Sequence, residues 1–159
     1  LYGVKPDVMT LAKALGCGVP VGAFVVNDKA DGALVPGDHG TTYGGNPFAC
    51  AAINAVFEQF EEKKVPEHAK AVGEYLWDQL EQLKDQYDFI SGHRGIALMQ
   101  GLEFVPEKPA GEIVNAALKK GLILMTAGNN VIRFVPPLVI EEKDVDEMIR
   151  ILKEILDEA

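Results

Sequence analysis

Residues 6–26 read PDVMTLAKALGCGVPVGAFVV, an apolar stretch that is interrupted by one turn rich in glycine. We expect a strand over Asp7–Ala14, a turn at residues 16–20 and a second strand over Val21–Val26. Residues 27–45, rich in Gly, Asp and Pro, then form a long loop. Loops of this length inside compact domains are commonly functional, so the segment is a candidate for part of a site.

Downstream of this loop, apolar residues recur at helical spacing in several segments. Asn46-Pro47 is a typical helix start, because Asn caps well and Pro suits the first helical position. Further helices are predicted from Pro66 to about Tyr87, over Glu112–Lys120 and near the C-terminus, where one face carries Val145, Met148, Ile149, Leu152, Ile155 and Leu156. Strands are predicted at residues 89–91, 96–104, 122–125 and 131–135. This alternation indicates an α/β or α+β architecture.

The best candidate for a domain boundary is Lys63-Lys64-Val65-Pro66. We therefore expect residues 1–64 and residues 65–159 to form two parts, of which the second is a compact β-α-β-β-α unit. The sequence begins at Leu1 without an initiator Met or a signal peptide, and we interpret it as a piece of a longer protein.

Composition excludes several classes of function. The 159 residues are 48% hydrophobic and 25% charged, with 15 basic and 24 acidic residues and a net charge of −9. Without a basic stripe, a nucleic acid or an anionic membrane is not an expected partner, and the apolar runs are too short to span a bilayer. Cys17 and Cys50 lack metal-ligand spacing, so no disulfide framework and no metal site is expected, and a cytoplasmic location fits best.

Two cations stand in unusually apolar surroundings, Lys13 within Leu11–Leu15 and Arg133 within Val131–Val135. A lysine that loses its hydration is a nucleophilic amine that can condense with an aldehyde. The plainer interpretation is that its ammonium reaches water from the end of a strand. Arg133 is either half of a structural ion pair or a bidentate clamp for a substrate carboxylate.

A third element is the loop His39–Pro47, in which Thr41, Thr42 and several glycines precede a helix. Hydroxyls and free backbone N–H groups at a helix N-terminus suit a phosphate. The loop could equally be an ordinary capped turn. The other histidines, His68 and His93, are interpreted as surface residues without a role.

Together these segments resemble the class III pyridoxal-phosphate-dependent aminotransferases, and most of all those that act on N-acetylornithine. Residues 6–23 look like the segment with the Schiff-base lysine, residues 39–47 like the phosphate loop, and residues 127–138 like the segment with the carboxylate-binding arginine. Arg94–Glu103 lies between them in the matching order. The resemblance covers essentially the whole chain, which looks like the last two-fifths of such an enzyme. Cys17 stands where that family often has glycine.

The resemblance implies a fold-type I enzyme, with residues 1–64 at the end of the large domain and residues 65–159 as the small C-terminal domain. Lys13 would hold pyridoxal 5'-phosphate and move the proton. Thr42, together with Thr41, would bind a cofactor phosphate, in this family usually that of the neighbouring subunit. Arg133 would clamp the α-carboxylate of glutamate or 2-oxoglutarate. It also implies a homodimer with a shared site. The reaction would be transamination of N-acetylornithine with 2-oxoglutarate, towards arginine.

Three alternatives within the class are aminotransferases for ornithine, succinylornithine or 4-aminobutyrate, because residues that choose the substrate's side chain lie largely upstream. A different class of function, a noncatalytic folded module, stays open for the 159 residues alone, which lack the family's aspartate for the pyridine nitrogen.

Overall fold

The computed structural model describes residues 2–158. The chain divides into two compact units, an N-terminal unit, Leu1–Lys63, and a C-terminal unit, Lys64–Ala159. Each has its own sheet.

The N-terminal unit contains one antiparallel ladder of two strands, β1 (Val8–Leu11) and β2 (Ala23–Val26). Both strands are shorter than predicted: β1 ends before a single 3-10 turn, Lys13–Leu15, and β2 begins at Ala23. Gly16 permits that turn, since a Cβ there would lie 2.6 Å from the Cγ1 atom of Val21. The predicted loop after β2 contains one short helix, α1 (Asp28–Asp31), which the side chain of Asn27 caps.

Helix α2 (Pro47–Glu62) begins where the sequence predicts. The Asn46 side chain accepts a hydrogen bond from the backbone N–H of Ala49 at 2.9 Å, and Pro47 occupies the first turn. Of the described residues in this unit, Gly16 and Ala49 alone are buried. The N-terminal unit therefore has no hydrophobic core of its own.

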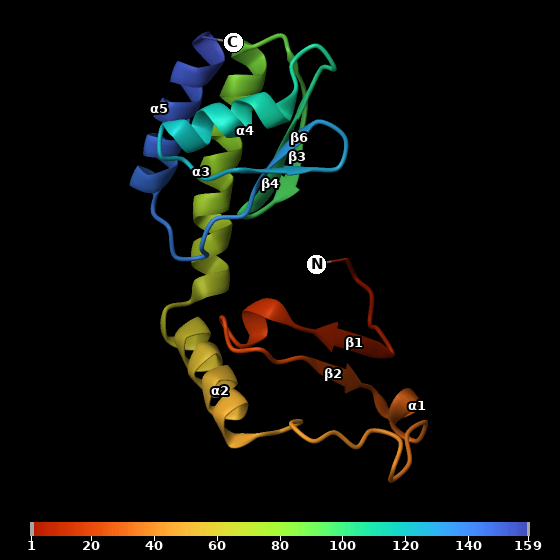
Figure 1. The fold of residues 1–159 in the computed structure, drawn as a ribbon. Helices are drawn as coiled ribbons and strands as arrows, with labels where there is room; N and C mark the ends of the chain where they lie inside the picture. Colours follow the sequence, from red (N-terminus) through yellow and green to blue (C-terminus); the bar gives the residue numbers. More distant parts are fainter. Residues whose placement is uncertain (1, 159) are drawn as a thin grey trace. The chain divides into compact units, whose positions relative to one another are not determined.

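The C-terminal unit is built from three helices and a four-stranded antiparallel sheet. Its helices are α3 (Val65–Gln86), α4 (Ala110–Lys119) and α5 (Glu142–Asp157). The strands are β3 (Ile90–Ile96), β4 (Met99–Phe104), β5 (Met125–Ala127) and β6 (Val131–Phe134), in the order β3-β4-β6-β5. Figure 1 shows the helices on one face of this sheet, and the core lies between the two layers.

The predicted apolar stripes of α3 and α5 face this core. Leu76, Leu80 and Leu83 of α3 and Val145 and Leu152 of α5 are each at most 1% exposed. Gly73 lets α3 approach the turn between β3 and β4, because a Cβ at that position would lie 2.6 Å from the carbonyl oxygen of Ala97. The Gln100 side chain reinforces the contact by donating to the carbonyl oxygens of Gly73 and Ala97 at 2.8 and 2.6 Å.

Several details of the C-terminal unit differ from the sequence predictions. The predicted strand 96–104 begins too early, since Ile96 ends β3 and Ala97 turns with a φ of 46°. Residues 122–124 are not part of a strand, and β5 starts at Met125. His93 is not a surface residue: its side chain is 0% exposed and lies between Glu81 and Gln100, at 2.7 and 3.0 Å.

His68 is half-buried rather than exposed, and its Nε2 atom lies 2.8 Å from the carbonyl oxygen of Ile140. Within residues 2–158, no helix is long and apolar enough to cross a membrane. The same residues contain no cluster of three or more side chains suited to a metal ion.

Candidate functional site

Lys13 opens the 3-10 turn that follows β1, with a φ of 53°. Its side chain is exposed and has no ion pair within residues 2–158. The apolar neighbours did not bury it, because β1 and β2 form a ladder of only two strands. Within the described residues the ammonium of Lys13 reaches water, as in the plainer interpretation, and the loss of hydration that makes a lysine nucleophilic is not present.

Cys17 follows in the same turn and has a φ of 46°, in the left-handed region. Glycine enters this region without steric cost, whereas other residues lose roughly 1–2 kcal/mol. The backbone conformation therefore explains why the family that this sequence resembles would favour glycine at position 17. Cys17 is a tolerated replacement that keeps the turn small.

Thr41 and Thr42 lie in the irregular loop before α2, and both are exposed. Gly45, with a φ of 67°, and the bond from the Asn46 side chain to the carbonyl oxygen of Tyr43 at 2.8 Å lead the chain into the helix. Within the described residues neither threonine hydroxyl has a hydrogen-bond partner. The 16-residue helix after them adds backbone N–H groups and a dipole that favour an anion.

Arg133 lies on β6, and its side chain points to the opposite face of the sheet from its two neighbours. Ile132 and Phe134 point into the core at 0% and 2% exposure, and Arg133 is exposed on the other face of the sheet. Its Nη2 atom lies 2.9 Å from the Sδ atom of Met125, the residue directly opposite it on β5. Within residues 2–158 it pairs with no carboxylate, so the ion-pair interpretation has no partner in this part of the chain.

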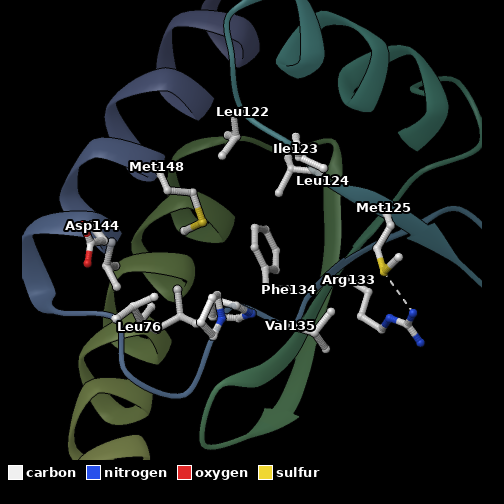
Figure 2. Close-up of a pocket in the computed structure, with 14 residues that line it drawn as sticks. Leu76, Leu122, Ile123, Leu124, Met125, Arg133, Phe134, Val135, Asp144 and Met148 are labelled. Atoms are coloured by element: carbon white, nitrogen blue, oxygen red, sulfur yellow. Dashed lines mark hydrogen bonds between the residues drawn. The ribbon is translucent and has the colours of Figure 1, made fainter. Parts of the chain in front are cut away.

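An apolar pocket of about 370 Å³ lies beside this strand. Figure 2 shows the ring of Phe134 within it and the guanidinium of Arg133 turned away, towards the sulfur of Met125. The base of the arginine side chain thus borders an apolar wall while its charge stays free. Because the guanidinium points away from this pocket, a carboxylate bound to Arg133 would lie outside it.

Sequence reasoning missed Asn130, which fixes the turn before β6. Its Nδ2 atom donates to the carbonyl oxygens of Phe104, Val105 and Lys108 at 2.9, 2.8 and 3.1 Å. Its Oδ1 atom accepts from the N–H of Ala110 at 2.6 Å, and its φ is 56°. The available signal was an Asn in a turn segment, since Asn tolerates the left-handed region and bonds to nearby backbone.

Comparison with known proteins decides the family. Residues 1–156 match the model of the class-III aminotransferases. The chain belongs to the class III aminotransferase family. The predicted family is therefore confirmed.

Curated relatives of this class III chain include two acetylornithine aminotransferases. That of Methanocaldococcus jannaschii is 44% identical over 157 residues, which are 99% of this chain and 39% of the relative. That of Caldanaerobacter subterraneus is 46% identical over 158 residues, with the same two shares.

Solved structures of class III relatives give the same result for the fold. Acetylornithine aminotransferase from Elizabethkingia anophelis matches with a TM-score of 0.90 at 32% identity, over 99% of this chain and 40% of that one. Plasmodium falciparum ornithine delta-aminotransferase also reaches 0.90 at 32% identity, over 98% of this chain and 40% of its own. The predicted fold, a part of an aminotransferase, is confirmed, and this chain spans about 40% of its relatives' length.

Lys13, Thr41 and Thr42 belong to the N-terminal unit, and Arg133 belongs to the C-terminal unit.

Proposed function

We propose that the chain is the C-terminal part of a pyridoxal-phosphate-dependent aminotransferase that transfers an amino group from N-acetylornithine to 2-oxoglutarate, towards arginine. The names of the relatives support the substrate, and they are 44% and 46% identical over 99% of the chain. In this proposal residues 1–64 end the large domain, residues 65–159 form the small domain, and the complete enzyme is a cytoplasmic homodimer with a shared site.

The exposed residues of the N-terminal unit fit this cofactor. Within the part of the chain that the structure describes, Lys13 offers an amine with no ion pair, and Thr41 and Thr42 offer hydroxyls without partners before a 16-residue helix. An aldehyde and a phosphate are the two groups that such residues bind. When bound, pyridoxal phosphate would supply the electron sink that makes the carbon bearing the amino group acidic.

The chain's own residues would perform three tasks. Lys13 would hold the cofactor through its Nζ atom, and would then take the proton from the reacting carbon and return it. Thr42, with Thr41, would fix the phosphate and thereby orient the ring. Arg133 would bind the α-carboxylate of glutamate or 2-oxoglutarate with both ends of its guanidinium, because no carboxylate of the described residues neutralises it.

Replacing Lys13 tests the proposal most directly. In the complete enzyme, Lys13→Ala should abolish the absorption band of lysine-bound pyridoxal phosphate and reduce kcat by at least about a thousandfold, as loss of a covalent catalytic group does. Lys5→Ala, another exposed lysine of the same unit, is the matched control and should change neither. An active Lys13→Ala enzyme would exclude the assigned role.

Arg133→Lys tests the carboxylate clamp. Lysine keeps the charge but loses the planar fork, which should cost about 1.5–3 kcal/mol of carboxylate binding. The measurement is the KM for glutamate and for N-acetylornithine in the complete enzyme. If neither constant changed, Arg133 would not be the clamp.

A second candidate is an aminotransferase for ornithine, because ornithine delta-aminotransferase matches this chain as well in structure as the acetylornithine enzyme does, with TM-scores of 0.90. Values of kcat/KM for N-acetylornithine, succinylornithine, ornithine and 4-aminobutyrate, measured side by side, distinguish these reactions. A preference for unacylated ornithine would favour the second candidate.

For the 159 residues alone, a noncatalytic folded module is the alternative. We expect this piece to bind pyridoxal phosphate weakly or not at all. A stable complex of one cofactor per chain, seen by absorption spectroscopy, would contradict that expectation.

A further inference from the structure

The face of the sheet that carries Arg133 contains a second arginine. In the antiparallel register, Gly101 of β4 lies opposite Arg94 of β3 on one side and opposite Arg133 of β6 on the other. Residues directly opposite each other share a face, so both arginines point to the side away from the core. They also line the same hollow of about 280 Å³, and Gly101 adds no side chain between them.

One carboxylate lies within reach of both arginines. Glu103 is two residues beyond Gly101 on β4, opposite Gly92 on β3 and Val131 on β6. It is therefore a diagonal neighbour of Arg94 and of Arg133, a separation of about 7–8 Å between backbones that long side chains bridge. Within the four described strands, Glu103 is the one acidic residue of this face.

Glu103 pairs with Arg94 and not with Arg133. The Nη1 atom of Arg94 donates to its Oε2 atom at 2.6 Å. Arg133 instead has the thioether of Met125 as its partner, at 2.9 Å, and a thioether is a weak, uncharged acceptor. Among the described residues, the charge of Arg133 is thus left uncompensated, which leaves it available to an incoming carboxylate.

From this arrangement we propose that Arg94 is a positioning residue for the substrate carboxylate: by holding Glu103, it keeps that side chain from neutralising Arg133. The inference rests on the proposed role of Arg133 and extends it to specificity. Without Arg94, Glu103 would occupy the guanidinium as an internal competitor of glutamate and 2-oxoglutarate. Arg94 acts through Glu103 and need not touch the substrate.

The test uses the complete enzyme and two charge-removing variants. Arg94→Gln should raise the KM for glutamate about fivefold with kcat nearly unchanged, the factor that a competing surface ion pair of about 1 kcal/mol produces. Adding Glu103→Gln in the same chain removes the competitor and should restore the original KM. Binding of glutarate, a dicarboxylate that cannot react, should follow the same pattern in calorimetry.

Two controls separate this role from a structural one. Arg150→Gln also removes an exposed arginine that is paired with carboxylates, on α5, and should leave both constants unchanged. Glu103→Gln alone breaks the Arg94 pair without freeing a competitor, so it should not raise KM. Melting temperatures of all variants identify any that fail to fold.

Several outcomes would overturn the inference. These are an unchanged KM in Arg94→Gln, a double variant as weak as the single one, or a raised KM in Glu103→Gln alone. The proposed function is judged separately by Arg133→Lys. If that variant weakens glutamate binding while Arg94→Gln does not, the clamp stands and the role of Arg94 falls.

Discussion

The C-terminal unit closes around a core in which Leu80, Leu83 and Ile132 are 0% exposed, whereas the N-terminal unit leaves Phe24, Phe48 and Phe57 at least 51% exposed. Burial of apolar surface is the main driving force for folding, at about 25 cal/mol per Å². The C-terminal unit has that driving force within its own residues. The N-terminal unit, which carries Lys13 and Thr42, depends on further polypeptide for it.

This contrast predicts that, when each unit is expressed alone, one folds and the other does not. Residues 64–159 expressed alone should fold cooperatively, because their helices and sheet bury a common core. Residues 1–63 alone should not, because a two-stranded ladder is marginal in water. Circular dichroism and dispersion of amide NMR signals measure both, and a cooperatively folded 1–63 would refute the contrast.

Single substitutions sharpen the comparison within the 159-residue chain. Leu80→Ala removes a side chain that is 0% exposed and should lower the free energy of unfolding by about 2–5 kcal/mol. Phe57→Ala removes a larger side chain that is 53% exposed and should cost less than about 1 kcal/mol. Urea denaturation gives both free energies of unfolding. If the two substitutions lowered that free energy equally, Phe57 would have to be buried in a way that contradicts its exposure in this structure.

Tyr87 is expected to make the C-terminal unit less stable as the pH becomes strongly alkaline. Burial, followed by the hydrogen bond from its Oη atom to Asp157 at 2.6 Å, raises the pKa of Tyr87 to about 12. In the unfolded chain the phenol has a pKa of about 10, so the contribution of Tyr87 to the free energy of unfolding is complete below that pH. This contribution is lost as the pH rises from there through the raised pKa of the folded state.

The measurement is the free energy of unfolding of residues 64–159 between neutral and strongly alkaline pH. Tyr87→Phe should lack this component of the alkaline loss, whereas the lysines that titrate in the same range affect both proteins alike. Parallel curves for the two proteins would show that the buried phenol is not the cause.

The smallest expected effect concerns the turn after Lys13. Cys17→Gly should stabilise the complete enzyme by up to about 1 kcal/mol, because glycine has no steric penalty at a φ of 46°, although it gains entropy when unfolded. Gly18→Ala, at a φ of 106°, is the comparison and should destabilise the enzyme. Thermal denaturation decides, and a destabilised Cys17→Gly would contradict the backbone explanation.

Local patterns predicted the helices better than the surroundings of single side chains. The start of α2 followed from Asn46-Pro47, and the stripe of α3 followed from its apolar spacing, since both depend on neighbours in the sequence. The burial of the His93 side chain could not be predicted in this way, because Glu81 and Gln100 approach it from other elements. Glu81 itself has a lowered pKa, through its bonds to Lys84 and then to His93.

The candidate site shows the same limit. Lys13, Thr41, Thr42 and Arg133 were named from their chemical type in unusual surroundings and from a family resemblance. Arg94 and Glu103 looked like ordinary charged residues, and their relation to Arg133 depends on strand register, which the sequence pattern leaves undetermined.

The close approach at Gly73 provides a marker for reading related sequences. Residue 73 has no room for a methyl group, since that carbon would lie within 2.6 Å of the Ala97 carbonyl oxygen. A homologue with a larger residue there must have moved α3 outward or rebuilt the turn between β3 and β4. Both changes would alter the end of the strand that carries Arg94, so variation at this one position indicates which relatives keep the same spacing of charges.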